Sequence, residues 1–126
     1  METLELNDVT IRWISVSDME NNVYLITSKN TDKQVLIDAA NDTAQIEKLV
    51  KEHGNGKIEA ILTTHSHPDH IQSLADIART FEARTLAGLY DVSEIENQSG
   101  IEIDEQLAND DMLEFDGFRL RAVHLK

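Results

Sequence analysis

Residues 58–81 combine three features whose order restricts the fold more than any other part of the chain does. Residues 58–63 are an apolar run typical of a short buried strand. Three of the five histidines of the chain follow within residues 65–70. Apolar residues then recur with the spacing of one helix face, at Ile71, Leu74, Ile77, Ala78 and Phe81. The polar turn is therefore expected at the carboxyl end of a strand, where α/β folds usually bind ligands.

The segment before this unit is predicted to form strands. Val9, Ile11 and Trp13 alternate with polar residues, which is typical of a half-buried strand. Residues 23–27 and 35–37 are β-branched or apolar runs, and the polar stretch 28–33 joins them. We therefore expect these two runs to form a hairpin with a long loop.

A helix is expected between this hairpin and the strand 58–63. Asp42 and Gln45 have the spacing of a capping box, and Gly54 stands where a helix C-cap belongs. Four residues between them fall on one helix face: Ile46, Leu49, Val50 and His53. His53 lies near the end of this helix, where the helix dipole favours it, and is not expected to bind a metal. Strands followed by helix, strand and helix predict an α/β layered domain.

The last third of the chain is acidic. Residues 91–116 contain ten carboxylates and no lysine or arginine. We interpret this segment as a solvated acidic face or loop; the alternative is a rim that repels anionic substrates. Residues 112–115 and 118–125 are predicted to form a hairpin that turns at Asp116 and Gly117. Because the last strand runs to the end of the chain, residues 1–126 are interpreted as the N-terminal part of a single domain whose C-terminal part is absent.

Composition excludes several classes of function. Asp and Glu number 24 against 11 Lys and Arg, which gives a net charge of −13. This charge argues against nucleic acid and against an anionic membrane surface as partners. The chain has no cysteine, so any metal must be bound by histidine and carboxylate. No signal peptide and no apolar run of about 20 residues is present, so a cytoplasmic location is expected.

The histidine-rich turn has the spacing of a metal site. In an extended backbone, His65 and His67 point to the same side and can converge on one ion, and Pro68 favours that extended form. Asp69 and His70 form a second pair, so two adjacent ions about 3.5–4 Å apart are the simplest interpretation. Imidazole and carboxylate donors favour zinc, with iron and manganese as alternatives. A structural alternative for Asp69 is the N-cap of the following helix, since Asp69-x-x-Gln72 also fits a capping box.

The segment Thr64-His65-Ser66-His67-Pro68-Asp69-His70 resembles the T-H-x-H-x-D-H signature of the metallo-β-lactamase fold superfamily. The resemblance implies the first half of an αββα sandwich, with a mixed sheet and flanking helices. It implies that His65 and His67 bind the first metal, and that Asp69 and His70 bind the second. It also implies that Asp38, which follows the strand 35–37, is a buried acidic residue that supports the site from behind the ligands.

The chain also departs from the family pattern. The family's third histidine for the first metal, its bridging aspartate and its last histidine lie in segments that follow the region matched by this chain. His124 is close to the expected place of the third histidine, but no Gly-His-Thr-Pro-Gly pattern surrounds it. We therefore do not assign His124 as a ligand.

The resemblance implies a metal-dependent hydrolase similar to glyoxalase II (hydroxyacylglutathione hydrolase), acting on a small-molecule thioester, lactone or similar acyl substrate. A metal-activated water would attack the carbonyl group, and Asp69 would be the catalytic residue that orients this water and accepts its proton. One alternative is an enzyme similar to the mononuclear iron persulfide dioxygenases. Another is that the 126-residue chain is a non-catalytic fragment that self-associates through an exposed sheet edge. A β-lactamase is disfavoured by the lack of an export signal, and a nuclease by the negative charge.

Overall fold

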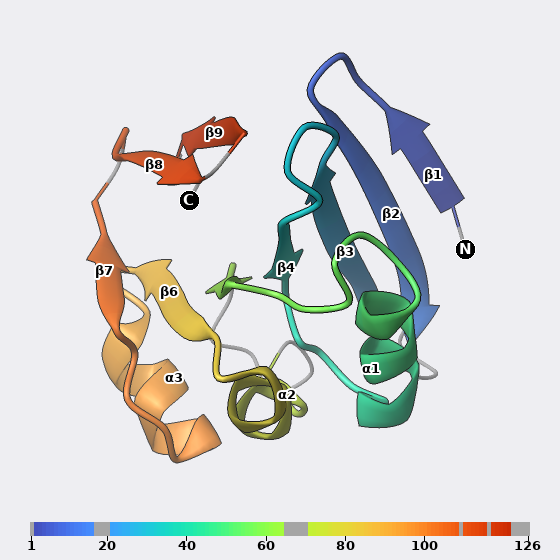
Figure 1. Cartoon of the computed structure of the whole chain (residues 1–126). Helices are drawn as coiled ribbons and strands as arrows, with labels where there is room; N and C mark the ends of the chain where they lie inside the picture. Colours follow the sequence, from blue (N-terminus) through green and yellow to red (C-terminus); the bar gives the residue numbers. More distant parts are fainter. Residues whose placement is uncertain (1, 17–20, 65–70, 109, 116, 122–126) are drawn as a thin grey trace.

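The computed structural model describes residues 2–16, 21–64, 71–108, 110–115 and 117–121. Within them the chain forms a seven-stranded sheet, a two-stranded hairpin and three helices (Figure 1). The sheet strands are β1 (Glu2–Glu5), β2 (Val9–Val16), β3 (Asn21–Ser28), β4 (Gln34–Ile37), β5 (Ala60–Thr63), β6 (Arg84–Gly88) and β7 (Glu105–Leu107). The hairpin is β8 (Met112–Phe115) and β9 (Phe118–Arg121), and the helices are α1 (Thr43–Lys51), α2 (Leu74–Phe81) and α3 (Val92–Ser99).

The large sheet is mixed, with its strands in sequence order. Strands β1 to β4 are antiparallel neighbours, whereas β4 to β7 are parallel. The predicted hairpin of β3 and β4 is confirmed, and its loop is closed where Ser28 N donates to Lys33 O (2.9 Å). The parallel half places the carboxyl ends of β4, β5, β6 and β7 at one edge of the sheet.

Side chains of the parallel strands alternate between two apolar layers. Leu36, Ile61 and Ala87 point to the face covered by the helices. Val35, Ala60 and Leu86 point to the opposite face, where Leu113 and Phe115 of β8 pack on them. The helices and the β8–β9 hairpin therefore lie on opposite sides of the sheet (Figure 1). This arrangement confirms the predicted α/β class, with a mixed sheet and flanking helices.

Helix α1 begins as predicted but ends earlier. Asp42 is its N-cap, and the Asp42 carboxylate accepts from Gln45 N (3.3 Å) and from Gln45 Nε2 (2.7 Å). The expectation that Gly54 caps the other end is wrong, because the helix ends at Lys51 and Glu52 is the C-cap. Gly54 instead has a positive φ of 50° and lies against Gln34, so closely that a Cβ atom there would meet the Gln34 side chain.

Helix α2 buries the predicted stripe. Ile71, Leu74 and Ile77 are almost fully buried, and Ala78 and Phe81 pack against the same core. The predicted start of the helix is wrong: α2 begins at Leu74 with Ser73 as N-cap, so Asp69 does not cap it. Ile71 belongs to the turn before the helix. It therefore fits the apolar spacing because it is buried, and not because it is helical.

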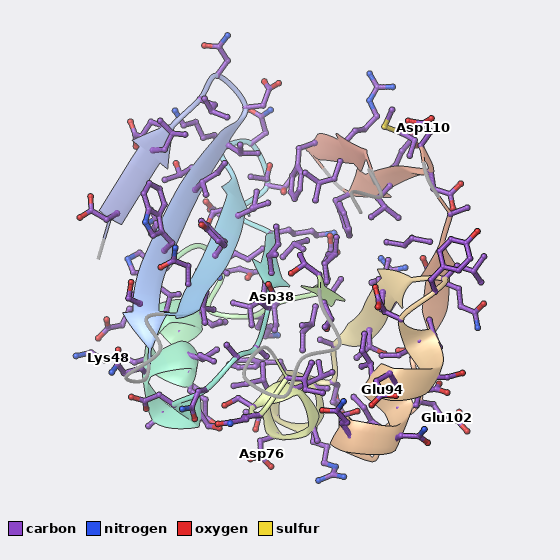
Figure 2. The ribbon with its side chains drawn as sticks, turned by 180° about the vertical axis from the view of Figure 1, so that it is seen from behind. Asp38, Lys48, Asp76, Glu94, Glu102 and Asp110 are labelled. Carbon is purple, nitrogen blue, oxygen red and sulfur yellow. The ribbon has the colours of Figure 1, made fainter. Side chains whose placement is uncertain are left out.

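The acidic segment 91–116, interpreted from the sequence as a solvated face or loop, contains regular structure. Helix α3 and strands β7 and β8 lie within it, and Val92, Ile95 and Ile103 are buried. None of its described carboxylate residues belongs to this core. Glu94, Glu102 and Asp110 are exposed, whereas Asp38 is buried and lies in the middle of the molecule in Figure 2. Strands β1 and β6 were not predicted from the sequence.

The alternating pattern of β2 predicted a strand but not the burial of its polar side. Thr10 is buried, whereas Ile11 and Trp13 are only half-buried. Thr10 and its neighbour Arg12 lie on the helix-covered face, where Arg12 Nη1 donates to Thr27 Oγ1 (3.1 Å). This hydrogen bond links polar side chains of β2 and β3, so Arg12 and Thr27 have a hydrogen-bond partner on the helix-covered face.

The two edge strands of the sheet are β1 and β7. All four residues of β1 are exposed, and Glu2, Glu5 and Glu105 place carboxylates on the edges. Charged side chains on an edge strand oppose pairing with a second chain. Self-association through a sheet edge stays a prediction. None of the helices in the described ranges is long and apolar enough to cross a membrane.

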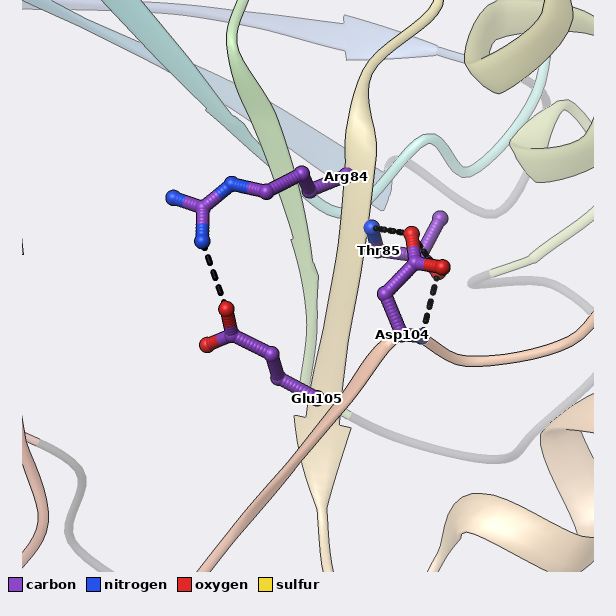
Figure 3. A network of polar contacts seen from close by, with 4 residues as sticks. All are labelled: Arg84, Thr85, Asp104 and Glu105. Atoms are coloured by element: carbon purple, nitrogen blue, oxygen red, sulfur yellow. Dashed lines mark hydrogen bonds and ion pairs between the residues drawn. The ribbon is translucent and has the colours of Figure 1, made fainter.

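A polar network holds β7 beside β6 (Figure 3). Thr85 N and Thr85 Oγ1 both donate to Asp104 Oδ2, at 2.8 and 3.2 Å, and Asp104 N donates to Thr85 O (2.9 Å). Thr85 is buried, and its hydroxyl contacts polar atoms of the segment before β7. The adjacent ion pair of Arg84 and Glu105 (2.6 Å) is about half exposed on both sides.

These two neighbouring contacts should differ in their effect on stability. Asp104→Ala leaves Thr85 N without its acceptor in a partly buried place, and should lower the free energy of unfolding by about 1–3 kcal/mol. Glu105→Ala removes an exposed ion pair and should cost less than about 1 kcal/mol. Urea unfolding of both variants measures the difference. A larger loss for Glu105→Ala would contradict this account of how β7 is held.

Candidate metal centre

Asp38 and Thr64 lie side by side at the carboxyl edge of the sheet. Asp38 directly follows β4 and Thr64 directly follows β5, and these two strands are parallel neighbours with Ile37 paired to Leu62. Asp38 has a positive φ of 62°, a conformation that aspartate tolerates better than most residues. The chain therefore turns sharply at Asp38 instead of continuing β4.

The Asp38 carboxylate holds Thr64 with both oxygens. Thr64 N donates to Asp38 Oδ1 (2.7 Å), and Thr64 Oγ1 donates to Asp38 Oδ2 (2.5 Å). Asp38 N in turn donates to Leu62 O (2.8 Å), which continues the ladder beyond the last residue of β4. Asp38 is 5% exposed whereas Thr64 is exposed, so these partly buried, charge-assisted hydrogen bonds hold the chain at the point where it leaves β5.

The far side of the turn is anchored to the same segment. Ser73 N donates to Ala39 O (3.0 Å), and Thr43 Oγ1 donates to Ser73 Oγ (2.9 Å). Ser73 is buried and caps α2. The segment from Asp38 to Thr43 therefore contacts the chain both before and after the histidine-rich turn.

The predicted ligands His65, His67, Asp69 and His70 lie outside the described residues, and so does His124. Their assignment as ligands stays a prediction. In the part of the chain that is described, no group of three or more His, Asp or Glu side chains could hold a metal ion. The structure therefore describes the frame of the predicted ligands, by which we mean Asp38, Thr64 and Ser73 on either side of them.

The chemistry of this frame fits a metal site with histidine and carboxylate ligands. The carboxylate of Asp38 is buried, as the resemblance implied, whereas its supporting role stays a prediction. Thr63, the last residue of β5, is 5% exposed, and its Oγ1 atom has no hydrogen-bond partner among the described groups. A buried hydroxyl without a partner is uncommon and is often found beside functional groups. The donor set of the turn, which lacks thiolate, suits zinc first.

His53 lies elsewhere and has a local role. Its Nδ1 atom lies 2.8 Å from Leu49 O, a carbonyl of the last turn of α1. This hydrogen bond satisfies a helix-terminal carbonyl and agrees with the expected position near the negative end of the helix dipole. Sequence reasoning singled out Asp38, whose supporting role stays a prediction, but missed its hydrogen-bond partner Thr64 and the second anchor at Ser73.

Comparison with known proteins gives one family. The sequence model described as Metallo-beta-lactamase superfamily matches residues 17–120. No curated protein gives a significant match.

Several solved structures share the fold at low sequence identity. BJP-1, a subclass B3 metallo-β-lactamase of Bradyrhizobium japonicum, is 22% identical, with a TM-score of 0.74 over 98% of this chain and 51% of that chain. A metallo-β-lactamase of Cronobacter sakazakii with a HARLDQ motif is 16% identical, with a TM-score of 0.78 over 98% and 54%. LRA-12, a class B3 di-zinc enzyme from an Alaskan soil metagenome, is 20% identical, with a TM-score of 0.75 over 93% and 49%. The chain therefore spans about half the length of these structures.

The contact between Asp38 and Thr64 can be tested by an isosteric change. Asp38→Asn keeps the shape and tolerates the positive φ, and its amide can still donate to Thr64 Oγ1, but both hydrogen bonds then lose the negative charge of the carboxylate. We expect the free energy of unfolding to fall by about 1 kcal/mol, the difference between charged and neutral hydrogen bonds. We also expect zinc affinity to fall about 10–100-fold, as for other groups that orient metal ligands.

Asp42→Asn is the matched control for this variant. Asp42 has the same φ of 62°, and asparagine is an equally good N-cap, so both quantities should stay near those of the unsubstituted protein. Urea unfolding in the presence of chelator and zinc titration measure the two effects separately. Unchanged zinc affinity in Asp38→Asn would contradict a supporting role for Asp38.

Proposed function

Because the chain belongs to the metallo-β-lactamase superfamily, we propose that its histidine-rich turn is the active site of a zinc-dependent hydrolase. Members of this superfamily are mostly metal-dependent hydrolases. The observation that carries the proposal is the Asp38–Thr64 contact, which fixes the chain at the residue before His65. A buried carboxylate that holds both the backbone and the hydroxyl of Thr64 sets the direction in which the chain continues toward His65 and His67.

The proposed ligands are those that the sequence predicts. His65 and His67 would hold one zinc ion, and Asp69 and His70 a second, with the remaining ligands outside residues 1–126. Bound zinc would supply Lewis acidity toward a carbonyl group and would activate water near neutral pH. Asp69 would be the catalytic residue, because a carboxylate beside the reacting water can orient it and accept its proton.

The proposed substrate class is a thioester, a lactone or a related small activated acyl compound, as in hydroxyacylglutathione hydrolases of the glyoxalase II type. The second candidate is a persulfide dioxygenase-like enzyme, which the same first-metal ligands would also suit with a single iron ion. The net charge of −13 speaks against a nuclease substrate in either case. We further propose a cytoplasmic location, as expected from the sequence.

Ligand substitution should separate site residues from other histidines. We expect His67→Ala to lower the zinc content and abolish hydrolysis, because one of the two ligands of the first ion is lost. His53→Ala should leave both near the values of the unsubstituted protein, since the imidazole of His53 is hydrogen-bonded to Leu49 O at the end of α1. Elemental analysis and activity assays measure the two effects. Equal losses in both variants would show that the effects arise from folding.

The choice between the two candidate reactions depends on metal and substrate together. The hydrolase predicts two zinc ions per chain, turnover of acyl thioesters or lactones, and loss of that turnover in Asp69→Ala with folding intact. The dioxygenase predicts one iron ion and oxygen consumption with a persulfide substrate. Elemental analysis of protein purified without chelator, followed by both assays, distinguishes them. Less than about 0.2 metal per chain would speak against both, because each needs at least one bound ion.

A further inference from the structure

Leu89 and Tyr90 occupy the two central positions of a tight turn that follows β6. Asp91 N donates to Gly88 O (2.9 Å) and closes the turn, and Leu89 N donates to Leu107 O (2.8 Å) and ties it to β7. Such positions usually hold glycine, proline, asparagine, aspartate or serine. Here they hold two large apolar residues, of which Leu89 is 46% and Tyr90 is 80% exposed.

This turn lies at the same edge of the sheet as the candidate metal centre. Strands β5 and β6 are parallel neighbours, and Thr63 is paired with Ala87 in the register. The next residues, Thr64 and Gly88, are therefore neighbours at the carboxyl edge, where Gly88 is the last residue of β6. The turn with Leu89 and Tyr90 begins there, beside the residue that Asp38 holds in place.

Two carboxylates at this edge of the sheet restrict the group that can contact the turn. Asp91 is the last residue of the turn, and the neighbouring turn after β7 is closed where Ala108 N donates to Asp111 Oδ2 (2.8 Å). The whole segment 91–116 carries no lysine or arginine to offset these charges. A negatively charged group would be repelled from such a surface. An uncharged apolar group can contact Leu89 and Tyr90 without this cost.

We propose that Leu89 and Tyr90 form a contact surface for the acyl group of the substrate, and that this group is an uncharged alkyl chain or aromatic ring. This inference rests on the proposed hydrolase function and narrows its substrate class to thioesters or lactones with an apolar acyl group. Burial of apolar surface against the two side chains supplies the affinity. Leu89 and Tyr90 thus determine specificity and take no part in the bond cleavage.

Ligand binding tests the surface without any need for turnover. The probes are the S-octyl and S-ethyl thioethers of N-acetylcysteamine, which are neutral, cannot be hydrolysed and differ only in the apolar chain. We expect the protein to bind the S-octyl probe more tightly in calorimetric titration. The double variant Leu89→Ala with Tyr90→Ala should weaken S-octyl binding about tenfold and leave S-ethyl binding unchanged, in line with the usual effect of small changes in apolar contact.

Leu4→Ala is the matched control. Leu4 is 48% exposed, close to the value for Leu89. It lies on β1, the edge strand at the far side of the sheet from β6 and β7. Its substitution should change the affinity for neither probe. Equal S-octyl affinity in the double variant and the unsubstituted protein, an equal loss in Leu4→Ala, or absence of S-octyl binding would overturn the proposal.

Kinetic measurements separate this inference from the proposed function. In the hydrolase, the ratio of kcat/KM for octanoyl and acetyl thioesters of N-acetylcysteamine should fall about tenfold in the double variant. If the unsubstituted protein hydrolyses neither thioester, the hydrolase proposal fails, while the titrations still decide whether Leu89 and Tyr90 contact an apolar group. If both are hydrolysed with a ratio that the double variant does not change, only the inference about Leu89 and Tyr90 fails.

Discussion

The hydrogen bonds between Asp38 and Thr64 are the constraint on which the candidate site depends. They join the ends of two parallel strands just beyond the last ladder hydrogen bond, and they do so with a buried carboxylate. A buried carboxylate is costly unless donors satisfy its lone pairs, and Thr64 supplies two of these donors. The positions of Asp38 and Thr64 are therefore linked, and the chain is held at Thr64.

The chain uses the same pairing of threonine and aspartate at the other end of the sheet, with a different result. Thr85 and Asp104 join β6 to the residue that precedes β7, and Asp104 leads directly into a strand. That pairing only aligns neighbouring strands. Thr64 follows its strand and leads into a segment rich in metal donors. The two contacts have the same chemistry. Their positions differ, because only the contact of Asp38 with Thr64 lies at the carboxyl edge, where α/β folds usually bind ligands.

Sequence reasoning predicted the elements whose apolar pattern agrees with their structure, such as the hairpin of β3 and β4 and the buried stripe of α2. It missed β6, whose short length and polar neighbours hide Leu86 and Ala87, and α3, where only Val92 and Ile95 are buried among carboxylates. The burial of Asp38 could be predicted because the family that the chain resembles has a buried acid at this position. Its partner Thr64 could not, since the contact depends on how β4 and β5 pair. The ligand assignments at residues 65–70 stay predictions.

The two anchors of the histidine-rich turn also bear on how tightly it can bind a metal. Asp38 holds the chain before the turn at Thr64, and Ala39 and Thr43 hold it after the turn at Ser73. Under the proposed function, fixing Thr64 and Ser73 when the domain folds lowers the entropy cost that metal binding between them would otherwise carry. On that proposal, metal affinity is coupled to the stability of β4 and β5, and a change that loosens the loop between β4 and α1 should weaken metal binding without touching a ligand.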